Sequence, residues 1–284
     1  MEEELKVTET PTVENKETKK ECPLRKIFIE GTFEKKNLIL TCVILVLALV
    51  ITILTGITYQ KFKKYQTYFD KSNVTYIAHL GDYSPKLTGV AKDTEVYVIA
   101  GPDADVSENG IGDITNCPSI LIMGGTHPNE PSGQVTATLF LENALVERGI
   151  LYVITELNRS AYSYSQPQEA TTWYYHLKTA SGKTRTFKYG SRATNTTDQW
   201  PTPDVYTHSS GQQLSSSEVR NINRAYPGSE NGTYTEQIAW AITNFVNTND
   251  VTIVIDLHEA SPEYLTINAC VYHQDAIEIG RAHV

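Results

Sequence analysis

An apolar run that passes directly into a glycine-rich turn, at residues 119–133, most constrains the fold of this chain. Residues 119–123, SILIM, are typical of a strand buried on both faces, as in a parallel sheet. Residues 133–147 then carry apolar side chains at helical spacing. The intervening turn, GGTHPNE, is therefore expected at the carboxyl edge of a sheet, where open α/β folds place their ligands.

This turn contains His127 and Glu130, which are spaced HxxE. An imidazole and a carboxylate on one tight turn can bind a single cation, and zinc accepts both donors. Taken alone, such a pair is more often an ordinary surface turn. A metal site needs at least one further ligand from elsewhere in the chain.

A second apolar run supplies that ligand. Residues 251–255, VTIVI, are β-branched, and the run ends at Asp256-Leu257-His258. Parallel strands of one sheet end at the same edge, so we expect His258 to approach His127 and Glu130. Two His, one Glu and an open fourth position form the ligand set of a hydrolytic zinc centre. Asp256 is a candidate to orient one of the ligands by a hydrogen bond.

Three motifs, GGTHPNEPSG, NINRAYPG and DLHEA, occur in that order. With them the chain resembles the zinc-dependent succinylglutamate desuccinylase/aspartoacylase family, within the zinc carboxypeptidase group, over roughly residues 97–276. The resemblance implies one zinc ion per chain, held by His127, Glu130 and His258. It also implies that Asn223 and Arg224 hold a substrate carboxylate. A guanidinium grips a carboxylate with two hydrogen bonds and an amide adds a directional one.

Two further roles follow less directly from the resemblance. Arg220 is a candidate to stabilise an oxyanion. The family's general base is a Glu that comes well after the third zinc ligand. Glu259 and Glu263 come too soon to match it, so no residue is assigned as the general base, and we expect this chain to lack it.

We therefore expect a zinc metallohydrolase that cleaves an amide bond of a carboxylate-bearing substrate, of the N-acyl amino acid deacylase type. One alternative is a membrane-anchored zinc carboxypeptidase that acts on extracellular or cell-wall peptides. Another is a non-catalytic, membrane-tethered binding module. The net charge of −9 argues against nucleic acid as a partner.

The expected fold is α/β, with a mixed, largely parallel sheet flanked by helices, in a domain spanning residues 91–277. Residues 95–100 are predicted to form its first strand, at a sheet edge, and residues 150–155 the strand that completes a βαβ unit. Thr233 and Glu236 are spaced as a capping box that opens a helix reaching about residue 246. The polar stretch 163–217 is interpreted as an insertion of short strands and loops at the substrate entrance, with His176 and His208 on the surface.

Residues 38–58 contain no charged side chain and are long enough to span a bilayer. We predict a single transmembrane helix there, preceded by a disordered tail (1–37) and followed by a juxtamembrane stalk (59–90). More basic residues precede this helix than follow it, which favours the N-terminus inside and an extracytoplasmic catalytic domain. The membrane is thus an expected partner, through residues 38–58.

Four smaller expectations complete the sequence analysis. Cys117 and Cys270 could form a disulfide or stay as two buried thiols. Asn158 and Arg159 follow a strand and could line the same crevice. Residues 279–284 match the translation of ATC GGA AGA GCA CAC GTC, the start of a common sequencing adapter, so residues 278–284 are interpreted as a non-native tail. We accordingly expect the natural domain to continue beyond this chain.

Overall fold

The structure is a computed structural model of the chain, and it describes residues 35–64, 69–164, 173–200, 205–207, 211, 213–214 and 216–260. The chain divides into two compact units, Met1–Lys63 and Lys64–Val284. Residues 1–34 of the predicted tail, His208, Glu263, Cys270 and the predicted non-native tail lie outside the described residues, whereas residues 35–37 of the predicted tail are helical. The question of a disulfide between Cys117 and Cys270 is therefore untested.

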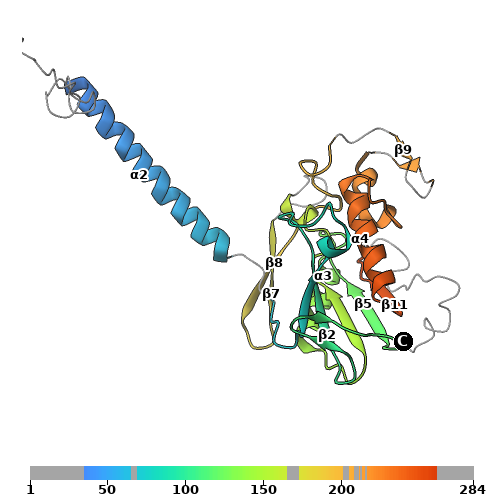
Figure 1. Cartoon of the computed structure of the whole chain (residues 1–284). Helices are drawn as coiled ribbons and strands as arrows, with labels where there is room; N and C mark the ends of the chain where they lie inside the picture. The colour runs from blue at the N-terminus through green and yellow to red at the C-terminus, as the bar shows by residue number, and fades with distance from the viewer. Residues whose placement is uncertain are drawn as a thin grey trace, which may run out of the picture. The chain divides into compact units, whose positions relative to one another are not determined.

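In the first unit, helix α2 (Lys35–Lys64) contains the apolar run (Figure 1). Its residues Asn37–Gln60 are long and apolar enough to cross a membrane, and its apolar side chains are exposed. A signal sequence satisfies the same two criteria, so the membrane anchor stays a prediction.

The second unit contains a five-stranded sheet in the order β1-β2-β6-β5-β11. Its strands are β1 (Tyr76–His79), β2 (Glu95–Ala100), β5 (Ser119–Met123), β6 (Ile150–Ile154) and β11 (Ile253–Asp256). Strands β6, β5 and β11 pair in parallel, whereas β2 is antiparallel to both β1 and β6. Four of the five strands thus run in one direction, and the expected mixed, largely parallel sheet is confirmed.

Two helices cover opposite faces of this sheet. Alternate strand residues such as Val98, Leu121 and Tyr152 pack with the buried side of α4 (Tyr234–Thr248). The residues between them, such as Ile122 and Val153, pack with α3 (Pro131–Asn143). This alternation is what a strand buried on both faces requires. Thr233 and Glu236 form the predicted capping box at the start of α4.

Strand β1 corrects one sequence expectation. Residues Tyr76–His79 lie in the range predicted to be a stalk, yet they pair with β2, so β2 is neither the first strand nor at the edge. A four-residue strand carries too little alternation to be recognised from its sequence. The 3-10 helix η1 (Leu80–Tyr83) follows β1 and contains the buried Leu80.

The remaining elements are short. Strands β3 (Val106–Ser107) and β4 (Gly110–Ile111) pair with each other. The described parts of the 163–217 stretch contain the hairpin of β7 (Tyr174–Lys178) and β8 (Thr184–Lys188), and the pair of β9 (Tyr206–Thr207) and β10 (Gln213–Leu214). The 3-10 helices are η2 (Ala161–Ser163), η3 (Ser216–Arg220) and η4 (Ile222–Arg224).

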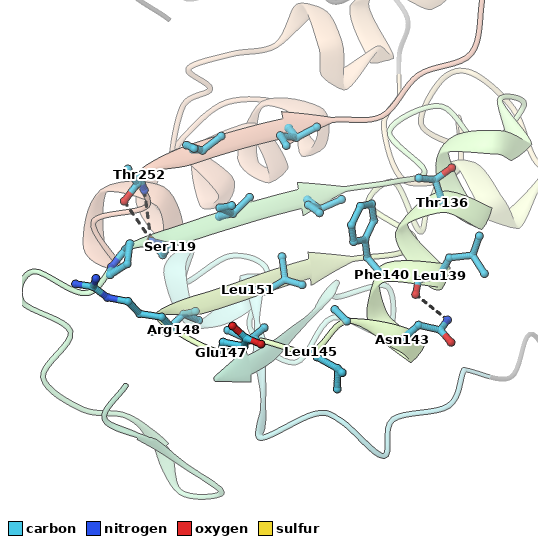
Figure 2. Close-up of a pocket in the computed structure, with 18 residues that line it drawn as sticks. Ser119, Thr136, Leu139, Phe140, Asn143, Leu145, Glu147, Arg148, Leu151 and Thr252 are labelled. Atoms are coloured by element: carbon cyan, nitrogen blue, oxygen red, sulfur yellow. Dashed lines mark hydrogen bonds between the residues drawn. The ribbon is translucent and has the colours of Figure 1, made fainter. Parts of the chain in front are cut away.

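On the α3 face, an apolar groove runs over β5 and β11 (Figure 2). Ile120 and Ile255 from the sheet and Leu139 and Phe140 from α3 line it and are all exposed. Among the described residues, no element covers this groove.

Candidate metal centre

The register of the sheet brings the two predicted motifs together. Asp256, the last residue of β11, pairs with Met123, the last residue of β5. The backbone N–H of Leu257 then donates to the Met123 carbonyl at 2.8 Å. The chain segments that carry His127 and His258 therefore leave the sheet side by side, at the edge expected for a ligand site.

The two glycines after β5 allow the turn to pass close to its neighbours. A Cβ on Gly124 would lie 2.5 Å from the carbonyl oxygen of Gly133 and 2.7 Å from the Cβ of Ala137, so strand and helix α3 touch here. Gly125 has φ +73°, a left-handed conformation that costs glycine little. This close approach fixes where the following residues, including His127, leave the sheet.

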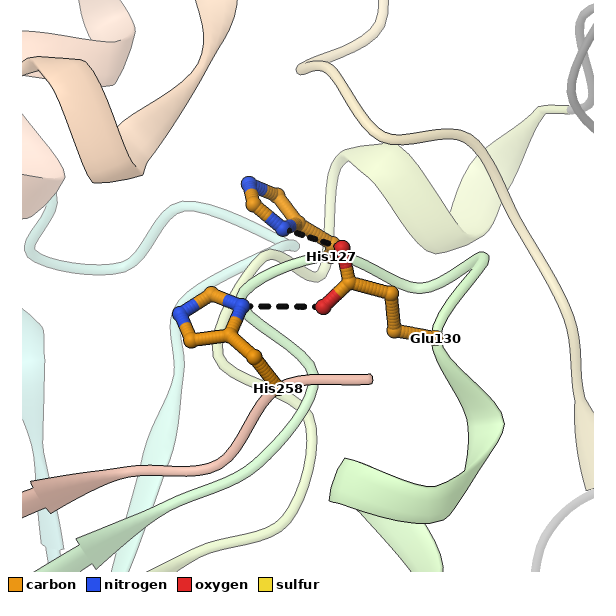
Figure 3. A group of neighbouring side chains, drawn as sticks. All are labelled: His127, Glu130 and His258. Carbon is orange, nitrogen blue, oxygen red and sulfur yellow. Dashed lines mark hydrogen bonds and ion pairs between the residues drawn. The ribbon is translucent and has the colours of Figure 1, made fainter. Parts of the chain in front are cut away.

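His127, Glu130 and His258 meet at this edge (Figure 3). One ligand atom from each lies within 4.8 Å of the other two. The Glu130 carboxylate lies between the rings, with Oε1 2.7 Å from His127 Nδ1 and Oε2 2.9 Å from His258 Nδ1. His127 is buried, whereas the His258 side chain is 32% exposed, so one side of the cluster is accessible.

The Nε2 atom of each histidine ring, which faces away from Glu130, also has a partner. His127 Nε2 lies 2.8 Å from the Asn221 Oδ1, and His258 Nε2 lies 2.9 Å from the Asp256 Oδ2. The Thr126 hydroxyl donates to the other oxygen of Asp256 at 2.6 Å. The predicted contact of Asp256 with a ligand is thus present, and both rings direct Nδ1 toward Glu130.

The same contacts shift the acidity of the cluster. Burial alone raises the pKa of Glu130, but hydrogen bonds with His127 and His258 outweigh it and hold that pKa well below its usual range. Hydrogen bonds with Asp256 and Glu130 raise the pKa of His258 from 6.5 to about 9, against the effect of burial. A proton on His258 therefore occupies the position where a cation is expected.

This donor set fits zinc. Two imidazole Nδ1 atoms and one ionised carboxylate converge, and imidazole with carboxylate is a ligand combination found in catalytic zinc sites. The ring nitrogens that face away already have acceptors, which is the usual arrangement for ligating His.

Arg192 is a site residue that the sequence analysis did not find. Its Nη1 lies 3.0 Å from Glu130 Oε1 and 3.2 Å from His127 Nδ1. It comes from the polar 163–217 stretch, which has neither periodicity nor a recognisable motif around GSRAT. The sequence contained no signal that would place this guanidinium beside the cluster.

Asn223 and Arg224 lie on η4, directly after the Asn221 that contacts His127. Arg224 Nε lies 3.5 Å from Glu218 Oε2, and its side chain is 37% exposed and so accessible to a ligand. The backbone N–H of Asn223 donates to Asn221 Oδ1 at 3.0 Å. The structure thus brings the NINR motif to the predicted metal site, while the carboxylate-binding role stays a prediction.

Other residues singled out in the sequence lie elsewhere. Arg220 is buried, and its Nη1 donates to the Thr194 carbonyl and to the Tyr164 hydroxyl, so it has little surface for a substrate. Its oxyanion role stays a prediction, for which Arg192 is the better placed residue. Asn158 is buried, and Arg159 donates to the Asp93 carbonyl at 2.7 Å. His176 is exposed, as expected, with Nδ1 2.9 Å from the Thr186 hydroxyl.

No protein-family model matches the chain, and no curated protein matches its sequence. An aspartoacylase family protein of Mesorhizobium loti is a similar solved structure, with 20% identity over 59% of this chain and 35% of that chain and a TM-score of 0.33. A succinylglutamate desuccinylase/aspartoacylase of Rhodobacter sphaeroides is 17% identical over 60% of this chain and 34% of that chain, with a TM-score of 0.32. The ectoine utilization protein EutE (DoeB) of Ruegeria pomeroyi, in a product-bound structure, is 19% identical over 59% of this chain and 33% of that chain, with a TM-score of 0.32.

This chain spans about a third of the length of these solved structures. Two of the three are named for the family that the sequence motifs resemble.

Proposed function

We propose that this protein is a zinc-dependent hydrolase that cleaves an amide bond of a carboxylate-bearing substrate, of the N-acyl amino acid deacylase type. The observation that carries the proposal is the convergence of His127, Glu130 and His258 from two separate segments. The contacts of Asn221 and Asp256 with the outer ring nitrogens support it, because an incidental surface cluster has no need of them.

In this proposal, His127, Glu130 and His258 hold one zinc ion. The chemistry that zinc supplies when bound is the activation of water near neutral pH and the polarisation of an acyl oxygen. Arg224 and Asn223 hold the substrate carboxylate and so orient the amide bond relative to the metal ligands. Arg192, next to Glu130, is placed to stabilise negative charge at the acyl oxygen.

We assign no general base. Glu259 is near the cluster, since its backbone N–H donates to Glu130 Oε2 at 3.1 Å. Its carboxylate, however, accepts hydrogen bonds from the backbone N–H and the hydroxyl of Ser132, at 3.0 and 2.7 Å. Those contacts hold it against the first turn of α3.

We propose the membrane anchor for this hydrolase whichever substrate it cleaves, and the anchor is also part of the carboxypeptidase alternative. Helix α2 would tether the domain at a membrane, with the N-terminus inside and the domain outside. A tethered zinc carboxypeptidase would use the same metal ligands and the same carboxylate-binding pair on a larger peptide. The polar insertion that we expect at the substrate entrance, to which the β7–β8 hairpin belongs, would suit such a substrate.

A substrate panel separates the candidate functions. The zinc-loaded protein, expressed from its whole natural gene, is incubated with N-acyl amino acids and with peptides that have a free C-terminus, and released amines are quantified. We expect the N-acyl amino acids to be hydrolysed faster. Faster release from the peptides would favour the carboxypeptidase. Binding of both classes without hydrolysis of either would identify a non-catalytic binding module.

A further inference from the structure

Glu218, on η3, lies at the junction of the metal ligands and the arginines, and no role has been given to it so far. Its Oε2 accepts a hydrogen bond from Asn221 Nδ2 at 3.0 Å. Its Oε1 lies 3.5 Å from the Nε of Arg192, and its Oε2 lies 3.5 Å from the Nε of Arg224. The carboxylate is therefore held by an amide and two guanidiniums.

The contact with Glu218 determines which way the Asn221 amide faces. An ionised carboxylate only accepts hydrogen bonds, so Asn221 must present its NH₂ group to it. The amide oxygen then faces the opposite way, where it accepts from the backbone N–H of Asn223 at 3.0 Å and meets His127 Nε2 at 2.8 Å. Asn221 is 1% exposed, so water cannot readily replace a lost partner.

The orientation of this amide in turn determines the state of His127. A ring nitrogen that faces an amide oxygen must carry the proton, and in a neutral imidazole the other nitrogen is then free to bind a metal. Here Nε2 faces Asn221, so Nδ1 is the atom that a neutral His127 ring offers to a metal, and without a metal this atom hydrogen-bonds with Glu130 Oε1. A reversed amide would present NH₂ to Nε2 and would favour a proton on Nδ1, at the metal position.

We propose that Glu218 is a positioning residue for the ligand His127, acting through the orientation of the Asn221 amide. Arg192 and Arg224 support it by holding the carboxylate in place. This inference rests on one part of the proposed function, the binding of zinc by His127, Glu130 and His258.

The test compares Glu218→Ala with Glu218→Gln in the whole chain, with zinc affinity measured by competition with a chelator. Glu218→Ala removes the acceptor for Asn221, and we expect zinc affinity to fall about tenfold, at the low end for partners of metal ligands. The loss is partial because Asn223 favours the same amide orientation. Glu218→Gln retains an acceptor oxygen without the charge, so its affinity should stay close to that of the unmodified protein.

An effect of charge alone predicts a different pattern, in which both variants lose affinity equally because both remove one negative charge. That result would overturn the proposal. The exposed Glu108, in the β3–β4 turn, provides matched controls, since Glu108→Ala and Glu108→Gln should leave zinc affinity unchanged.

A double-mutant cycle tests the route through Asn221. Asn221→Ala should weaken zinc binding, and adding Glu218→Ala to it should cause little further loss, because the intermediate amide is already absent. Independent, additive losses would show that Glu218 does not act through Asn221. If the unmodified protein binds no zinc, the proposed function fails together with this one; if zinc binding is normal and unaffected by Glu218→Ala, only the positioning role fails.

Discussion

Arg224 combines exposure with a position next to the residues that hold His127. A lysine at this position keeps the charge but loses the planar fork that grips a carboxylate with two hydrogen bonds. We therefore expect Arg224→Lys to weaken binding of an N-acyl amino acid by roughly tenfold or more, the scale of one charge-assisted hydrogen bond. Zinc content should not change, as measured by elemental analysis beside calorimetric titration of the ligand.

The control for this variant is Arg148→Lys, because the Arg148 side chain is 78% exposed and lies near Asp103 rather than near the cluster. It should leave both readouts unchanged. Loss of zinc in Arg224→Lys would instead mark Arg224 as a structural residue.

His258 gives the metal-free protein a stability that depends on pH. Its folded-state pKa is raised from 6.5 to about 9, so the protonated ring stabilises the fold fully below about pH 6.5 and loses that effect as the pH rises through 9. In the presence of a chelator, we expect urea unfolding to show lower stability at pH 9.5 than at pH 6. His258→Asn should reduce this difference, and an unchanged difference would contradict the assigned contacts.

The convergence of His127, Glu130 and His258 could be predicted from the sequence because the segments that carry them follow recognisable apolar strands. His127 and Glu130 share one turn, and His258 ends a second apolar run. Arg192 and Glu218 could not be predicted in the same way. The contact of Arg192 with Glu130 and the contact of Glu218 with Asn221 depend on how the long polar stretch folds back, and that stretch has no periodicity from which its path could be predicted.

At the scale of elements, the strands and helices that could be predicted best have a long apolar pattern or a capping box at a defined spacing. Strands β2, β5, β6 and β11 and helix α4 follow the predicted segments closely. Helix α3 ends at Asn143, before the predicted residue 147, because the chain turns extended at Ala144. The short β1 depends on its pairing with β2, and the 3-10 helices are too short to show a periodic pattern in the sequence.

The capping box of α4 supports a quantitative prediction. The Thr233 hydroxyl accepts from the Glu236 backbone N–H, and the Glu236 carboxylate accepts from the Thr233 N–H at 2.8 Å. Thr233→Ala should lower the free energy of unfolding by about 1 kcal/mol, as for other N-caps. Thr248→Ala, at the exposed end of the same helix, should cost less than about 0.5 kcal/mol. Equal effects in chemical denaturation would contradict the cap.

At the scale of the whole molecule, the apolar α2 and the α/β unit predict a tethered hydrolase. The basic residues before the apolar run 38–58 favour an inside N-terminus, so protease added to intact cells should remove the domain. Protease added to inverted vesicles should remove the N-terminal tail instead, with both fragments followed by tag-specific antibodies. The reverse pattern would place the domain on the cytoplasmic side. Release of a soluble domain without α2 would identify a cleaved signal sequence.

The most direct measurement of the central claim is the zinc content of the purified protein and of two histidine variants. We predict about one zinc ion per chain, as for a site with three protein ligands, and a sharp loss in His258→Ala. His176→Ala, which removes an exposed histidine on β7, should retain the zinc of the unmodified protein. Zinc content that is unchanged in His258→Ala, or equally reduced in both variants, would contradict the metal centre.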